Sequence, residues 1–275
     1  MNRRIKKPSV VYTFVSNLIF NVLGVSMILC GITCGLLAIS LYLVFFYAPT
    51  EQVMGDVQRI FYFHVSSAWI AFLAFFLVMA ASIKYLRTNQ RKWDVFAYAS
   101  AEIGILFCTV VLLTGPVWAK PAWNVWWTWD LRLTTTLVLW LMYMGYLLLR
   151  KYVEGERGAK YAAVFGIIAF LDVPFVYFSI RVWRTQHPAP VIMGGEGAGL
   201  APEMLTTLLV CVITFMFLFA YLLQHRIAII SIQDELEELR RTIAEREQDM
   251  RKDILIENEN FIIEDYTFKE YQKKL

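Results

Sequence analysis

The chain has little charge and lacks the motifs that usually build soluble catalytic sites. Only 18% of its 275 residues are charged, 58% are hydrophobic, and the mean hydropathy is +0.52. A soluble domain of this length has no interior large enough to bury so much apolar surface. The sequence contains no Gly-rich phosphate loop and no nucleophile elbow. The net charge of +3 is too small to indicate a nucleic-acid partner.

Cysteine and histidine are also scarce. The four cysteines, Cys30, Cys34, Cys108 and Cys211, all lie in apolar stretches, where a cysteine usually behaves as a small hydrophobic residue. Their placement predicts no disulfide framework. Because there is no Cys-x-x-Cys-His motif, the chain does not attach haem to itself as a c-type cytochrome does.

What the sequence has instead is long apolar runs. About 20 mostly apolar residues are needed for a helix to cross a bilayer. The basic N-terminus leads into an apolar run that is too long for a cleaved signal, so we interpret it as a first span. The predicted fold is therefore all-α, a polytopic membrane protein with six transmembrane helices near 17–46, 65–83, 95–115, 133–149, 161–180 and 203–223.

The orientation follows from the basic residues in the short loops. The N-terminus and the even-numbered loops together hold twelve Lys/Arg, whereas the odd-numbered loops hold five. Cytoplasmic loops carry the excess of Lys and Arg. We therefore predict that both termini face the cytoplasm and that the odd loops face outward, in the inner (plasma) membrane of a cell.

The predicted organisation has three parts. Residues 1–16 form a cytoplasmic N-terminus, residues 17–223 a six-span membrane domain, and residues 224–275 a cytoplasmic tail. Residues 231–275 carry thirteen acids against eight bases, whereas the rest of the chain carries ten against eighteen. In the tail, apolar residues alternate steps of three and four, which predicts a solvated amphipathic helix, a coiled coil or a docking helix: Ile229, Ile232, Leu236, Leu239 and Ile243.

The third loop, 115–132, is predicted to face outward and is rich in tryptophan. Five of the nine tryptophans fall in it, and Asp130 closes the run. An interfacial aromatic belt needs only one or two such residues at each helix end. Large flat rings in one loop instead predict a platform for a broad, planar, apolar ligand, formed by Trp118, Trp123, Trp126, Trp127 and Trp129 with Asp130.

Two of the three histidines are predicted to lie on the same side as this loop. His64 stands at the outer mouth of the second span, and His187 follows the fifth span. A lone histidine near a helix end is more often an interfacial residue, but a pair beside the tryptophans favours two ligands of a haem iron. Cations on that side could also hold the haem propionates. Arg59 is the first candidate because it neighbours His64, followed by Lys120, Arg132 and Arg184.

One acid lies near mid-membrane, where an ionisable side chain is costly. Asp172 stands two residues before Pro174, which removes a backbone hydrogen bond and bends the helix. We interpret both as structural, with Asp172 serving local geometry or pairing with another span.

The chain from about Ala48 to Leu223 resembles the WWD-domain, haem-handling proteins of cytochrome c biogenesis, of the haem exporter protein C (CcmC) type. Three ordered segments carry the resemblance. The tryptophan segment runs from Thr114 and Gly115 to Arg132, Leu133 and Thr134. A first histidine motif holds Arg59, Ile60, Tyr62, His64, Val65, Ala68 and Trp69, and a second holds Asp172, Val173, Pro174, Tyr177, Phe178, Ser179, Trp183, Thr185 and His187.

The resemblance implies a haem-handling or transport subunit rather than an enzyme. His64 and His187 would ligate the iron of haem b, a transient cargo, over the tryptophan loop. The expected partners are an ABC-type ATPase with its membrane subunits, a small membrane subunit, and the haem chaperone CcmE, and any ATP hydrolysis would belong to a partner. Two alternatives remain open: a haem lyase or synthetase component, and a structural subunit of an ABC transporter complex that binds no haem.

Overall fold

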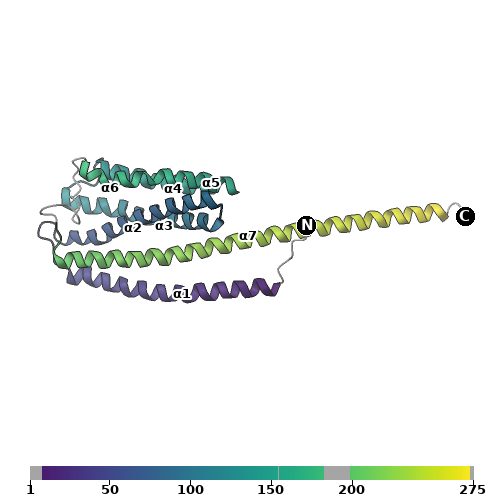
Figure 1. Cartoon of the computed structure of the whole chain (residues 1–275), viewed down its shortest axis with the longest axis horizontal. Helices are drawn as coiled ribbons and strands as arrows, with labels where there is room; N and C mark the ends of the chain where they lie inside the picture. The colour runs from purple at the N-terminus through teal and green to yellow at the C-terminus, as the bar shows by residue number, and fades with distance from the viewer. Residues whose placement is uncertain (1–7, 154, 183–198, 273–275) are drawn as a thin grey trace. The chain divides into compact units, whose positions relative to one another are not determined.

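A computed structural model describes residues 8–153, 155–182 and 199–272, and the regular elements in those ranges are helices (Figure 1). Six helical stretches among them are long and apolar enough to cross a membrane, which confirms the predicted all-α, six-span architecture. The elements are α1 (Pro8–Tyr42), η1 (Leu43–Tyr47), η2 (Asp56–Arg59), α2 (Ile60–Thr88), α3 (Arg91–Trp123), α4 (Leu131–Tyr152), α5 (Gly155–Phe170), α6 (Asp172–Val182) and α7 (Pro202–Gln272).

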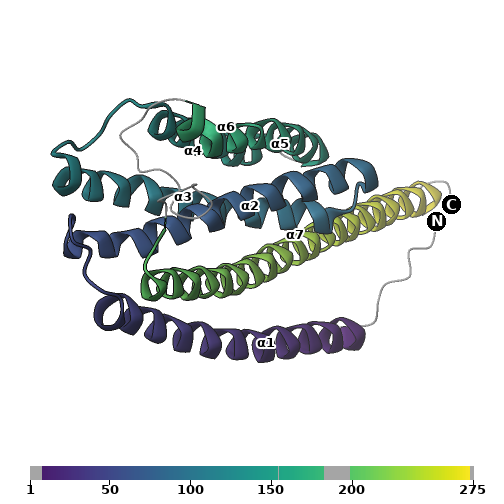
Figure 2. The ribbon, with the colours of Figure 1, turned by 60° about the vertical axis from the view of Figure 1, so that its left-hand side comes forward.

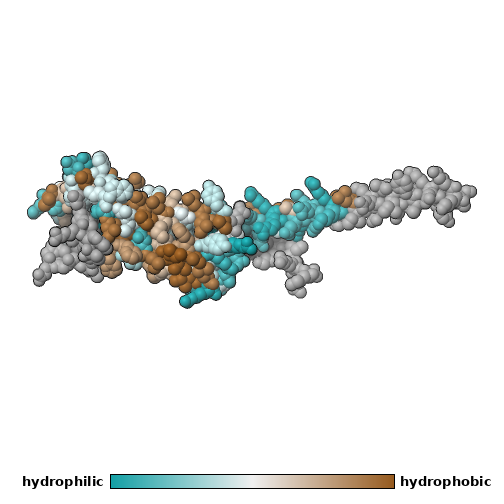
Figure 3. Space-filling view, turned by 90° about the horizontal axis from the view of Figure 1, so that it is seen from above, coloured by the Kyte–Doolittle hydropathy of each residue, from teal (hydrophilic) through white to brown (hydrophobic). Residues whose placement is uncertain are grey.

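The chain divides into two compact units, and the boundary between them follows Ile227. The first unit contains the membrane-crossing stretches, and the middle of the face seen in Figure 3 is covered largely by apolar residues. The second unit is the continuation of α7, a helix on which the apolar residues of the predicted seam are exposed: Ile229, Ile232, Leu236, Leu239 and Ile243. Whether this seam is solvated, forms a coiled coil or docks to a partner stays a prediction.

The α2–α3 hairpin forms the centre of the first unit. Its turn is possible because Asn89 adopts a left-handed conformation, with φ of 51°, and donates its N–H to the Tyr85 carbonyl at 2.7 Å. Gly104 allows the close approach, because a Cβ there would lie 2.7 Å from Phe75. On α4, the ring of Tyr143 stacks on Phe75 with centroids 3.8 Å apart. These contacts order α2, α3 and α4 around one core.

Helix α1 and the part of α7 that belongs to the first unit lie side by side (Figures 1 and 2), joined by polar side chains inside the candidate membrane-crossing stretches. The hydroxyls of Ser40 and Thr214 are 2.7 Å apart, and Ser26 Oγ lies 2.5 Å from His225 Nε2. The third histidine is therefore engaged between α1 and α7, near the cytoplasmic end in the predicted orientation.

Two ion-pair clusters tie the helices together at that same end. Arg226 on α7 donates two hydrogen bonds to Glu102 on α3, at 2.5 and 2.8 Å. Asp94 is buried between Arg91 and Arg150, which connects α3 to the last turn of α4. Glu102, a charged residue inside a span, is thus paired with a cation on another helix.

The fifth span is two helices rather than one. Helix α5 ends at Phe170 and α6 begins at Asp172. Pro174 has no N–H to donate to the Phe170 carbonyl, which explains a break at this point. Asp172 lies in the first turn of α6, where the helix dipole favours a carboxylate. Its Oδ2 is buried and accepts no hydrogen bond from the described part of the chain.

Candidate functional site

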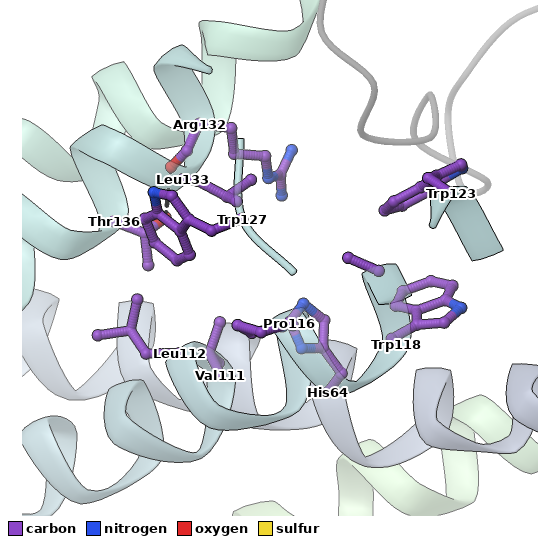
Figure 4. A pocket seen from close by; sticks show the side chains of 12 residues that line it. His64, Val111, Leu112, Pro116, Trp118, Trp123, Trp127, Arg132, Leu133 and Thr136 are labelled. Atoms are coloured by element: carbon purple, nitrogen blue, oxygen red, sulfur yellow. Dashed lines mark hydrogen bonds between the residues drawn. The ribbon is translucent and has the colours of Figure 1, made fainter. Parts of the chain in front are cut away.

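A cavity opens where α2, α3 and α4 meet, at the end of the first unit that carries the predicted outward loop (Figure 4). Its empty space, including the part open to solvent, is about 520 Å³. The lining combines one imidazole, three indoles, one guanidinium and apolar side chains: His64, Val111, Leu112, Gly115, Pro116, Trp118, Ala119, Trp123, Trp127, Arg132, Leu133 and Thr136.

The last turns of α3 form one wall of this cavity. The third span was predicted to end near residue 115, but the helix continues to Trp123 through Pro116 and Pro121. It ends because Asn124 takes a left-handed conformation, with φ of 58°, and donates its N–H to the Lys120 carbonyl at 2.9 Å. The first half of the predicted loop 115–132 is therefore helical. This regular backbone presents Trp118 and Trp123 on one wall.

Trp118 is the most buried of the tryptophans in this segment, with 5% of its surface exposed. Its ring meets the edge of His64 at 5.8 Å between centroids and lies 6.1 Å from Trp123. Its indole N–H donates to the sulfur of Met54 at 3.4 Å, which ties the wall to the segment between α1 and α2. Trp118 is thus fixed by packing on several sides.

His64 extends from α2 to the floor of the cavity and is 8% exposed. Figure 4 shows its imidazole between Trp127 on one side and Trp118 and Trp123 on the other. Its Nδ1 lies 2.8 Å from the hydroxyl of Thr114 on α3. The ring orientation is therefore set by a hydrogen bond between two helices.

The N-terminus of α4 forms the opposite wall. Asp130 caps this helix by accepting the N–H of Leu133 at 3.0 Å, and its other oxygen accepts the hydroxyl of Thr128 at 2.9 Å. The cap starts the helix so that Arg132 comes in its first turn and lines the cavity. Among the described residues, no hydrogen bond or ion pair engages the Arg132 guanidinium.

The structure brings only part of the predicted set into this cavity. Trp126 and Trp129 are 60% and 76% exposed and do not line it, and Asp130 acts as a helix cap. Lys120 donates to Asn124, at 3.0 Å to the side-chain oxygen. His187 and Arg184 lie outside the described residues.

Arg59 is engaged away from the cavity. It donates to the carbonyl of Val44, to the carbonyl of Ala48 at 3.3 Å, to the hydroxyl of Thr50 at 3.2 Å, and to Asp56 at 3.1 Å. These bonds fasten η2 to the end of the first span, and they use four of the five N–H donors of the guanidinium. Its predicted role beside a propionate is untested.

Sequence reasoning missed the apolar part of the lining and the hydroxyl partner of His64. Gly115 follows Val111 by four residues and Leu112 by three, and Ala119 follows Gly115 by four, so they share one face of α3. This spacing would have indicated the lining residues if the third span had been predicted to continue past residue 115. The Thr114–His64 contact joins residues 50 apart and leaves no local signal.

The arrangement suits a flat, apolar ligand that carries an acidic group and a metal ion able to bind an imidazole nitrogen. Among the described residues no cluster of three His, Cys, Asp or Glu could hold a metal ion by itself. Fold and cavity together define a polytopic helical membrane protein with an aromatic-lined cavity at one end of its helices.

The comparisons with known proteins identify the family. The family model for heme exporter protein C (CcmC) matches residues 3–242, so the chain belongs to that family. Heme exporter protein C of Bradyrhizobium diazoefficiens is 36% identical over 195 residues, covering 70% of this chain and 74% of that protein. A putative cytochrome c biosynthesis ccmC-like mitochondrial protein of Marchantia polymorpha is 32% identical over 191 residues, covering 70% and 81%. Heme exporter protein C of Haemophilus influenzae is 32% identical over 177 residues, covering 64% and 72%.

Proposed function

We propose that this protein binds haem in the cavity beside His64 and delivers it for cytochrome c maturation. The observation that carries the proposal is a single one. In a chain of the heme exporter protein C family, a nearly buried imidazole faces a cavity with tryptophans on both walls. His64 supplies one axial ligand of the iron, and His187 supplies the other.

The lining matches the chemistry of haem b. The porphyrin is broad, flat and apolar, so indole rings can cover its faces by stacking and burial. Trp118, Trp123 and Trp127 serve as the inner platform, while Trp126 and Trp129 are exposed residues of the same segment. A neutral imidazole is a common axial ligand of haem iron. Because the cavity is open to solvent, the cargo stays accessible for transfer.

Arg132 is the best placed partner for a haem propionate. It lines the cavity, and its guanidinium makes no hydrogen bond within the described residues. Arginine binds carboxylates through paired N–H donors. Arg59 and Lys120 remain candidates, although both already donate hydrogen bonds to other groups of the chain, and Arg184 is a fourth.

The protein works as a transport or handling subunit. It assembles with an ABC-type ATPase, the membrane subunits of that complex and a small membrane subunit, and it hands haem to the chaperone CcmE. ATP hydrolysis belongs to the ATPase, because this sequence has no phosphate-binding loop. The complex resides in the inner membrane with both termini of this chain in the cytoplasm, in agreement with the basic loops.

Visible absorbance of the purified protein tests the haem site. We expect a bis-imidazole Soret spectrum in the wild type, and loss of that spectrum or of bound haem in His64→Ala and in His187→Ala. His225→Ala is the matched control, since His225 contacts Ser26 between α1 and α7. An unchanged spectrum in both ligand variants would remove the assignment.

A transfer assay distinguishes a carrier from a lyase. The haem-loaded protein is incubated with the candidate chaperone or with an apocytochrome. Haem that moves to the chaperone alone supports the proposal, and haem joined directly to the apocytochrome supports a synthetase component. A protein that never acquires haem would leave only the role of a structural subunit.

A further inference from the structure

The hydroxyl of Thr114 makes two short hydrogen bonds, with His64 and Val110, and a longer one of 3.4 Å to the carbonyl of Val111. Its oxygen lies 2.8 Å from His64 Nδ1 and 2.7 Å from the carbonyl of Val110, one turn earlier on α3. A carbonyl can only accept, so the single hydroxyl hydrogen of Thr114 goes to Val110. The lone pairs of the oxygen then face His64, and the bond is complete only if Nδ1 carries a proton and donates it.

A second threonine on α3 shows the same arrangement with an unambiguous donor. Thr109 donates its hydroxyl to the Ile105 carbonyl at 2.8 Å and accepts the indole N–H of Trp140 at 2.8 Å. An indole nitrogen can only donate, so Thr109 must be the acceptor. The two threonines therefore use one geometry: each donates back along α3 and accepts a ring N–H from a neighbouring helix.

We propose that Thr114 is a positioning residue for His64. By accepting the Nδ1 proton, it fixes the neutral ring in one tautomer, with the lone pair on Nε2, the atom that coordinates iron. This inference rests on the proposed function, in which His64 is an axial ligand. Such outer partners orient a ligating histidine and raise its basicity. Gly115 lies beside the same ring, since a Cβ added there would be 3.6 Å from His64 Cε1.

The tautomer can be measured without haem. We would label the histidines with ¹⁵N, purify the protein in detergent, and record the ring-nitrogen signals at a pH where the ring is neutral. The signals absent from His64→Ala belong to His64. We expect the proton on Nδ1 in the wild type and in Thr114→Ser, and a mixture of tautomers in Thr114→Val. A wild-type His64 with its proton on Nε2 would overturn the inference.

Haem binding provides the second measurement. Loss of such an outer partner typically weakens a metal site by about 10- to 100-fold. We therefore expect Thr114→Val to weaken haem binding to that extent and to raise the reduction potential of bound haem, since a less basic imidazole stabilises Fe(III) less. Thr114→Ser should stay close to wild type. Thr109→Val is the matched control, because it loses the same pair of hydrogen bonds without touching His64.

The outcomes separate the two ideas. If His64→Ala binds haem as tightly as the wild type, the proposed ligation by His64 fails. If His64→Ala loses haem while Thr114→Val keeps wild-type affinity and potential, only the role of Thr114 is wrong. Equal losses in Thr114→Val and Thr109→Val would mean that both threonines merely stabilise α3.

Discussion

Recognition of the acidic part of the cargo can be tested by changing protein and ligand together. Arg132 is a cation at the cavity wall whose guanidinium makes no hydrogen bond or short ion pair within the described residues, and the charge of Asp130 lies near it. A hydrogen bond to a charged group contributes about 1.5–3 kcal/mol. Since about 1.4 kcal/mol corresponds to a tenfold change in affinity, Arg132→Gln should weaken haem binding by about 10- to 100-fold.

The ligand counterpart is haem dimethyl ester, which keeps the ring and iron but carries no carboxylate. Soret titrations of purified protein would give four dissociation constants. We expect the ester to bind wild type as weakly as haem binds Arg132→Gln, and we expect the variant to bind both ligands alike. Lys120→Gln is the control, because Lys120 donates to Asn124 instead of lining the cavity.

Two results would refute this reasoning. One is an ester that binds wild type as tightly as haem, since carboxylate recognition would then be absent. The other is an Arg132→Gln variant that weakens haem and ester by the same factor, which would mean that Arg132 maintains the shape of the wall. A selective loss in Lys120→Gln would move the carboxylate contact to that lysine.

Three further predictions follow from the contacts. Asp130→Ala should lower the free energy of unfolding in detergent by about 1 kcal/mol, while Asp130→Ser keeps a cap and most of the stability. Equal losses of unfolding free energy in the two variants would contradict a capping role. Trp127→Ala should weaken haem binding about tenfold, roughly the 1.4 kcal/mol expected for partial burial of a large ring. Trp126 is exposed, so Trp126→Ala should change haem affinity little. Similar losses in the two variants would contradict the assignment of Trp127 to the cavity wall. A double-mutant cycle of Glu102→Ala and Arg226→Ala should give a coupling of about 1 kcal/mol, because this pair is only partly buried; additive losses would mean the pair contributes nothing.

The number and order of the spans were predictable because hydropathy over some twenty residues is a strong signal. The end of the third span was not. The predicted loop began at residue 115, yet α3 continues through Pro116 and Pro121. Prolines are tolerated in membrane helices, because neighbouring groups compensate for the lost backbone bonds. Composition alone could not predict whether neighbouring groups would replace those backbone hydrogen bonds.

The candidate site was predictable as a set of residue types and less so as an arrangement. His64 and the tryptophan segment stood out, but the turn at Asn124 decides which rings line the cavity. Trp127 lines the cavity while its neighbour Trp126 is exposed. Arg59 stood out because it neighbours His64 in sequence, yet its bonds are to the end of the first span.

The two walls of the cavity belong to different helices, and this has a mechanical consequence. His64 and Thr114 join α2 to α3, and Trp118 and Trp123 belong to α3 as well. Trp127 and Arg132 instead precede or begin α4. A small tilt of α4 would therefore widen the cavity and move Trp127 and Arg132 away together. His64 and Thr114, on α2 and α3, would keep their geometry. In the proposed haem site, the contacts from Trp127 and Arg132 and the contact from His64 therefore depend on different helices.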